Sequence, residues 1–248
     1  MKKRIISMLL ACMMIFSLMP TAVLAYSDNA VAVIGDTEYA TLTAALDAVN
    51  TQTGDNVTLT VLKDVDEAIT TTYRFTKNLT ITADSAITID CGDMANGELF
   101  NSDNTTLTIG ENVTITDIFR IGPKDVNGKI IVNGPVKAQY LAINGNMNNL
   151  GGYSEAVING KVIGIGEGAL RTENNSKLTV NGTGKTGAQI ENMYVSASGS
   201  KAVEFNFTAK RNDIFSYFFY YNSKIICTDM RLCKIKNFLG SSEFYKCF

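Results

Sequence analysis

The chain has 248 residues, with 22 Lys and Arg against 24 Asp and Glu and a formal net charge of −2. It contains no histidine, which excludes Ser-His-Asp and Cys-His catalytic arrangements and most catalytic zinc sites. The mildly acidic balance lacks the basic face that nucleic acids require, so we expect no nucleic-acid partner.

The first 25 residues have the pattern of a secretory signal peptide. A basic stretch over residues 2–4 precedes an apolar run over residues 5–19, and Ala25 ends a small-residue cleavage pattern. The run is shorter than the ~20 residues that span a bilayer, so we expect cleavage after Ala25 and no later membrane span. The sequence therefore predicts a secreted or cell-surface protein. An uncleaved anchor and a lipoprotein modified at Cys12 are the alternatives.

Residues 26–56 predict a hairpin followed by a capping helix. An apolar strand, a Gly35-Asp36 turn and a second short strand succeed one another over residues 30–40. Thr41 occupies an N-cap position before apolar residues at helical spacing, namely Leu42, Ala45, Leu46 and Val49. We expect this helix to cover the N-terminal edge of the sheet that follows, because a bare edge leaves backbone groups unpaired.

Residues 57–211 alternate apolar residues with Thr, beginning at Val57-Thr58-Leu59-Thr60-Val61, which is the period of a β-strand. The strands recur at intervals of 20 to 28 residues, marked by Leu59, Leu79, Leu107, Ile131, Ile158 and Leu178. Repeats of this length are typical of solenoids.

Three Asn-Gly pairs follow strands at corresponding places, at Asn133, Asn159 and Asn181. Asn and Gly tolerate left-handed backbone conformations, so we interpret the pairs as a bend shared by successive coils. The three Asn side chains are predicted to form an internal ladder of amides, each bonded to the next coil.

Two architectures fit this pattern. Asn-Gly is also a strong hairpin signal, so an antiparallel β-sandwich is the alternative. Repeats longer than 20 residues exceed the spacing of sandwich strands, and residues 183–187 make a poor partner strand. We therefore predict a mainly β chain folded as a right-handed parallel β-helix.

The opening of the chain also resembles a known family. Residues 32–48, followed by 57–65, are similar to the start of secreted Gram-positive adhesin-like surface proteins whose coils have a pectate-lyase-like right-handed parallel β-helix. The resemblance covers roughly residues 30–210 and implies this fold and export. It favours a non-enzymatic, ligand-presenting protein, with glycans or host or cell-surface proteins as partners.

A polysaccharide lyase or glycoside hydrolase is the alternative function. Several acids follow strands and would stack about 4.8 Å apart if their register agreed, which would favour bound Ca²⁺; they are Asp64, Asp66, Asp90, Asp93 and Asp117. Asp64, Asp90 and Asp117 are the candidate metal ligands. The simpler interpretation is that strand ends are solvated turns, where acids are common.

The arginines that are candidates for bases or clamps lie outside any recognisable motif; they are Arg74, Arg120 and Arg171. We therefore predict no catalytic residue, and no cofactor other than the Ca²⁺ that the alternative function would bind.

The composition changes at residue 212. Residues 212–248 contain one of the 20 glycines, an aromatic run over 215–221, and three cysteines at Cys227, Cys233 and Cys247, while Cys91 is the only cysteine between residues 26 and 211. This distribution is not a disulfide framework. We interpret residues 212–248 as a frame-shifted or read-through end, which would make the chain a truncated fragment. An authentic docking segment is the alternative.

Overall fold

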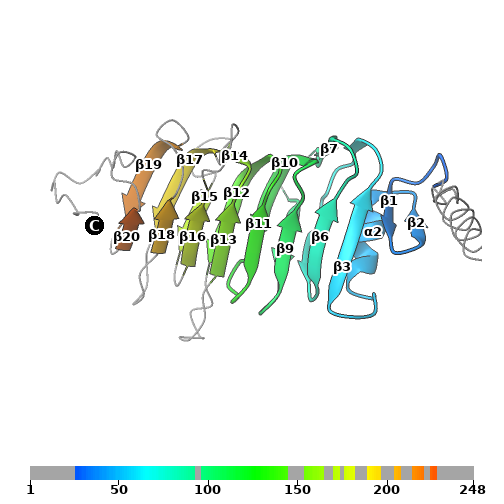
Figure 1. Ribbon diagram of the computed structural model, residues 1–248, viewed down its shortest axis with the longest axis horizontal. Helices are drawn as coiled ribbons and strands as arrows, with labels where there is room; N and C mark the ends of the chain where they lie inside the picture. The colour runs from blue at the N-terminus through cyan, green and yellow to red at the C-terminus, as the bar shows by residue number, and fades with distance from the viewer. Residues whose placement is uncertain are drawn as a thin grey trace, which may run out of the picture.

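The structure is a computed structural model that describes residues 26–92, 96–144, 154–164, 170–173, 176–181, 189–196, 204–207, 214–220 and 224–227. The described strands are stacked along one long axis as a β-helix, with one short helix near the N-terminal end (Figure 1). The predicted signal peptide and its cleavage site at Ala25 lie outside the described residues.

The N-terminal cap has the predicted form. Strands β1 (Ala32–Ile34) and β2 (Thr37–Tyr39) make an antiparallel hairpin, with Gly35 in the left-handed region at the turn. Helix α2 (Leu42–Val49) begins at Thr41, whose side chain accepts a hydrogen bond from the amide of Ala44. Its apolar stripe is buried against the start of the solenoid, so the cap protects that end from solvent.

The first sheet runs the length of the solenoid. In spatial order its strands are β2, β1, β3 (Asn56–Val61), β6 (Asn78–Thr82), β9 (Thr106–Ile109), β11 (Lys129–Val132), β13 (Ser154–Ile158), β16 (Ser176–Val180), β18 (Glu204–Phe207) and β20 (Lys224–Cys227). From β3 onward each strand pairs in parallel with the next coil, and among the described residues antiparallel pairs occur only at β1. The antiparallel sandwich is therefore excluded.

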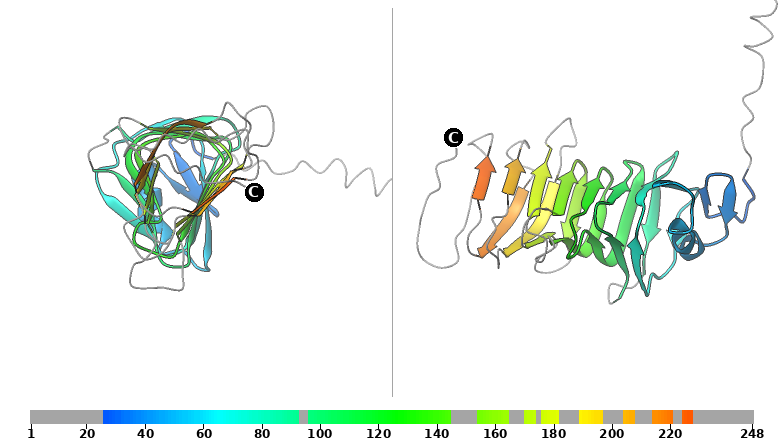
Figure 2. Two further views of the ribbon diagram at one scale, coloured as in Figure 1. Left: turned by 90° about the vertical axis from the view of Figure 1, so that its left-hand side faces the viewer. Right: turned by 90° about the horizontal axis from the view of Figure 1, so that it is seen from below.

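The second sheet closes the coil and bends as it does so. Its strands are β4 (Val65–Asp66), β5 (Thr72–Phe75), β7 (Ile87–Asp90), β8 (Glu98–Asn101), β10 (Val113–Gly122), β12 (Val136–Asn144), β14 (Lys161–Gly164), β15 (Leu170–Glu173), β17 (Gln189–Ser196) and β19 (Ile214–Tyr220). The start of β10 pairs with β7 and its end with β8, so one long strand serves two faces. Seen end-on, the coils enclose a roughly triangular core (Figure 2).

The core consists of apolar side chains that stack from coil to coil. Burial alternates along the strands because successive side chains point to opposite faces of a sheet. Equivalent positions hold one aliphatic residue per coil, as in the column Leu79, Leu107, Ile130, Ala156 and Leu178.

The predicted repeat markers all fall on the first sheet, but they do not share one register. Ile131 pairs with Thr108 and Val157 on the outer side and is only partly buried, whereas its neighbours Ile130 and Val132 fill the core. An apolar run of three residues hides which member faces inward, so this marker was misplaced by one residue.

The left-handed bend predicted at the Asn-Gly corners is also wrong. Gly134 and Gly160 do not have positive φ, so no left-handed bend demands glycine there. A Cβ on Gly134 would collide with the carbonyl oxygen of Val113, and one on Gly160 with that of Asn133. Glycine is required because backbones of successive coils approach closely at this corner. Gly182 lies outside the described residues.

The coil stacking continues past residue 211. Strand β19 pairs in parallel with β17, and β20 pairs in parallel with β18, so the composition change at residue 212 does not coincide with a break in either sheet. The boundary predicted at residue 211 is therefore not a boundary of the strand stack. The origin of residues 212–248 stays a prediction, which the nucleotide sequence around codon 211 would test.

Candidate functional site: a charged ladder on the first sheet

The acids proposed as calcium ligands have separate partners. Asp64 accepts a hydrogen bond from the amide of Thr88 at 2.7 Å, and Asp90 accepts one from the amide of Gly92 at 3.0 Å. Asp117 forms an ion pair with Lys137, with 3.2 Å between the charged atoms. These contacts close turns and join strands. Asp64 and Asp90 lie at strand ends, as the simpler interpretation expected, whereas Asp117 lies within β10.

The register does not bring the three candidate ligands into one column. Asp90 pairs with Asp66 on one side and with Thr116 on the other, so Asp117 lies one residue further along. Asp66 and Asp90 are thus the only pair of the five acids for which the structure gives a shared register. Within the described residues, no three Cys, Asp or Glu side chains gather closely enough to hold a metal ion. Asp93 lies outside the described residues.

Two of the three arginines are held by contacts within the protein. Arg120 forms a 2.9 Å ion pair with Glu98 and lies over the rings of Phe119 and Tyr140, at 4.3 and 5.6 Å from their centroids. Arg74 donates to the carbonyl oxygen of Asn101 at 2.9 Å and lies 5.5 Å from the Phe100 ring centroid. Arg171 lies in β15, and its side chain is outside the described part of the structure.

The asparagine ladder has the order that the sequence predicted. Asn181 Nδ2 donates to Asn159 Oδ1 at 2.7 Å, and Asn159 Nδ2 donates to Asn133 Oδ1, also at 2.7 Å. The three amides are half-buried at the corner of the coil, not inside the core. Asn78 and Asn56 make the same kind of contact at 2.9 Å at the other end of the strands.

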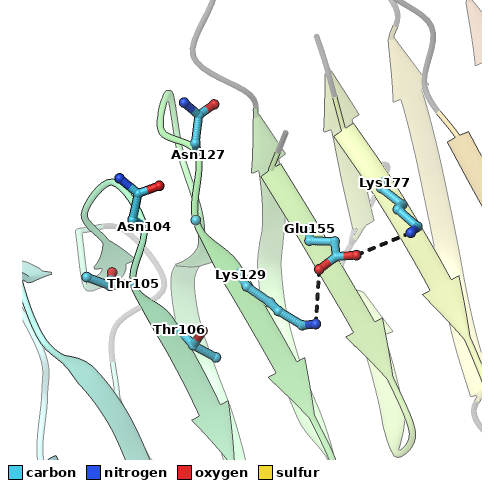
Figure 3. A pocket seen from close by; sticks show the side chains of 8 residues that line it. Asn104, Thr105, Thr106, Asn127, Lys129, Glu155 and Lys177 are labelled. Atoms are coloured by element: carbon cyan, nitrogen blue, oxygen red, sulfur yellow. Dashed lines mark ion pairs between the residues drawn. The ribbon is translucent and has the colours of Figure 1, made fainter. Parts of the chain in front are cut away.

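A second ladder, which sequence reasoning missed, lies on the outer face of the first sheet. Lys129, Glu155 and Lys177 occupy one register position on three successive strands. Glu155 contacts both neighbours, at 3.0 Å from Lys129 Nζ and 3.5 Å from Lys177 Nζ (Figure 3). About a third of each side chain is exposed to solvent. We call these three residues the charged ladder.

An open groove of about 510 Å³ lies against the charged ladder. Its other walls come from the coil corners and the strand beside β11, and they carry amide and hydroxyl groups together with one glycine: Asn104, Thr105, Thr106, Asn127 and Gly128. Asn104 and Asn127 lie on the loops above the ladder in Figure 3. Amide, hydroxyl and charged groups together suit a ligand that offers hydrogen bonds.

Two opposing effects act on the pKa of Glu155. Burial would raise the pKa, but the hydrogen bond from Lys129 and the positive charges of Lys129 and Lys177 outweigh burial and lower it from its usual value. The carboxylate is therefore ionised at neutral pH. It is suited to ion pairing and hydrogen bonding and is a poor general acid.

A strip of β-branched side chains runs beside the charged ladder. Thr108, Ile131, Val157 and Thr179 share one register position on the outer side of β9, β11, β13 and β16, and all are half-buried. The first sheet thus presents a flat outer face with an aliphatic centre at Ile131 and Val157, flanked by charges on one side and amides on the other.

Cys91 offers no accessible nucleophile. Its side chain is fully buried, and burial raises the pKa of the thiol to about 12, with further raising by the charges of Asp90, Asp117 and Glu67. The thiolate, which is the reactive form, is therefore absent at neutral pH. Cys233 and Cys247 lie outside the described residues.

In comparisons with protein-family models, curated proteins and solved structures, nothing matched the chain. The parallel β-helix that the resemblance implied is present, but no match supports the relationship to adhesin-like proteins. Within the part of the chain that the structure describes, the one helix is too short to cross a membrane.

Proposed function

We propose that the protein is a non-enzymatic, exported β-helix scaffold of adhesin-like type. In this proposal it presents a ligand-contacting face on the first sheet, and its partners are glycans or proteins of a host or cell surface. The observation that carries the proposal is the groove beside the charged ladder, where polar groups from successive coils converge on a rigid sheet.

The contacts of the charged residues support binding over catalysis. Asp64, Asp90, Asp117 and two of the arginines each have a partner within the protein, and the pKa of Glu155 is lowered. General acid catalysis by a carboxyl group needs the opposite shift. The charged ladder instead offers fixed donors and acceptors about 4.8 Å apart, a spacing set by the strands.

The rigidity of the ladder supports recognition of an extended ligand. Glu155 holds both lysines in place, so less side-chain entropy is lost when a ligand binds than with free lysines. A ligand that lies along the solenoid axis would meet the same spacing at each coil.

The experiment measures binding and cleavage together. The protein is incubated with immobilised pectin and a panel of host glycans and surface proteins, with Ca²⁺ present, and both retention and release of sugar fragments are followed. We expect retention on at least one surface, without cleavage, and weaker retention of K129A and K177A. K137A is the matched control, because Lys137 makes the same kind of ion pair on the second sheet.

Cleavage of any polysaccharide would contradict the proposal and favour the lyase or hydrolase alternative. Equal retention of K129A, K177A and the wild-type protein would place the contact surface elsewhere. Loss of retention in K137A alone would move it to the second sheet.

A further inference from the structure

The register position of the charged ladder alternates in charge over five successive strands. Lys129, Glu155 and Lys177 are followed at the same position by Glu204 in β18 and Lys224 in β20. At about 4.8 Å per strand, the five positions span roughly 19 Å along the solenoid axis. An alternating row of this kind can be complementary in charge to a second copy of itself.

Two such rows are complementary when they meet antiparallel. Consider a two-fold axis that lies between the two faces and runs parallel to the strands, midway between the positions of Glu155 and Lys177. This axis places Glu155 of each copy opposite Lys177 of the other. The same axis places the register position of Lys129 opposite that of Glu204. Two contacts between the charged groups of Glu155 and Lys177 result, one on each side of the axis. Two rows that meet in parallel and in register would instead place like charges together, which costs free energy.

We propose that the outer face of the first sheet binds a second copy of this chain in this antiparallel arrangement. The inference rests on the proposed function, since it names the partner of the contact surface proposed there. The same axis places Val157 of each copy opposite Thr179 of the other, beside the charged row, so half-buried β-branched side chains adjoin the charges in the contact.

The size of the face sets the strength of the contact. Five strands by about five residues cover roughly 400 Å² per copy, about half the ~800 Å² per partner of a stable dimer. The contact is therefore a weak one that dissociates readily in solution. Many copies on one surface would reinforce it through multivalency, a property suited to adhesion between surfaces.

Sedimentation velocity over a range of protein concentrations tests the proposal. We expect reversible dimer formation that strengthens at low ionic strength, because the contacts between charges are screened by salt. E155K or K177E alone places like charges opposite one another at two symmetric places, so each should weaken association by roughly tenfold or more. K137E is the control, because it reverses a charge on the second sheet.

Mixing the two single variants separates a contact between copies from an effect within one chain. E155K carries only positive charges at the two central positions and K177E only negative ones, so the mixture should form heterodimers although each variant alone does not. The double variant E155K/K177E should also recover association. Within one chain, however, the double variant places like charges on neighbouring strands. If the ladder acted only within the chain, the double variant would therefore be less stable than either single variant.

Association that is unaffected by E155K and K177E, or absent at every concentration at low ionic strength, would overturn the second copy as partner. Failure of the mixture to associate would do the same, with circular dichroism showing that each variant is folded. Retention on glycans or surface proteins by a chain that does not self-associate would leave the proposed function standing.

Discussion

Glu155 is held between two lysines, and this contact has a pH dependence with a definite sign. The pKa of Glu155 is lowered in the folded protein, so its contribution to stability is present above the pKa of the unfolded chain and is lost as pH falls through the folded pKa. The pairs are partly exposed, so the contribution is about 0.5–1 kcal/mol.

We therefore expect E155Q to be less stable than the wild-type protein at neutral pH and to approach its stability as the pH falls below the ordinary pKa of a glutamate. Urea unfolding at several pH values measures the difference. A difference that stayed constant from neutral to acidic pH would contradict the contact as its cause.

Asn159 accepts from one neighbouring amide and donates to the other, so its replacement breaks two hydrogen bonds at once. Asn159→Leu should lower the free energy of unfolding by about 1–3 kcal/mol, because Asn133 and Asn181 each lose a partner in a half-buried corner. Thermal unfolding followed by circular dichroism measures the loss. Thr179→Leu, at a half-buried outer position, is the control. An unchanged melting temperature in Asn159→Leu would show that the ladder adds no stability.

Cys91 gives a reactivity test of the same core. Because burial raises the pKa of its thiol to about 12, Cys91 should not react with a thiol reagent in the native protein at pH 8 and should react once the chain is unfolded. The variant for this test has serine at Cys12 and at the three cysteines beyond residue 211, so that only Cys91 is counted. Rapid labelling under native conditions would mean that the coil around Cys91 opens.

At the scale of elements, the N-terminal helix is joined to the first coil by a carboxylate. Glu67 accepts hydrogen bonds from the amides of Leu42 at 2.7 Å and Thr43 at 3.1 Å, and the Thr43 hydroxyl also donates to it. A negative charge at a helix N-terminus is favourable, because free amide groups and the helix dipole point toward it. The contact fixes the cap on the solenoid.

We expect Glu67→Gln to destabilise the protein by about 1 kcal/mol and Glu67→Ala by about 1–2 kcal/mol, since alanine removes both acceptors. Thermal unfolding and hydrogen exchange at residues 42–49 measure the effect. Asp47→Asn, an exposed change on the same helix, should have little effect. If amide exchange in the helix were the same in Glu67→Ala and the wild-type protein, the capping role would be wrong.

The elements themselves could be predicted well from the sequence. Helical spacing after Thr41 defined α2, and alternation of Thr with aliphatic residues defined the strands of the first sheet. The amide ladder was also predictable, because Asn-Gly recurs after equivalent strands. These features depend on local patterns, which a single chain displays directly.

The charged ladder could not be predicted in the same way. The three residues of the charged ladder are 26 and 22 residues apart, which are the same steps that separate the ladder asparagines. Other steps between coils reach 28 residues. Because loops of different length join the strands, no fixed period aligns these charges. The one usable signal was their distance to the Asn-Gly pair, since Lys129, Glu155 and Lys177 each lie four residues before a ladder asparagine. The prediction for Ile131 was wrong for a related reason, because an apolar run does not show which of its residues face the core.

At the scale of the whole molecule, the parallel stack converts distant residues into continuous columns on one face. The charged ladder, the β-branched strip and the asparagine ladder all depend on this alignment. The strands after residue 211 extend the stack, and Lys224 continues the alternation of charge. Every functional proposal made for the protein therefore requires that each coil adds one strand to the first sheet in the stated register.

Distances between spin labels on one column test that requirement most directly. Thr58, Thr80 and Thr179 share an outer column of the first sheet, with Thr179 five strands from Thr58 and four from Thr80. In a chain whose Cys12 and cysteines beyond residue 211 are replaced by serine, pulsed electron paramagnetic resonance should give about 24 Å between backbone positions 58 and 179 and about 19 Å between 80 and 179. A difference of one strand spacing between the pairs supports the account. Equal distances, or a longer distance from Thr80 than from Thr58, would contradict the stacked coils and the surface built on them.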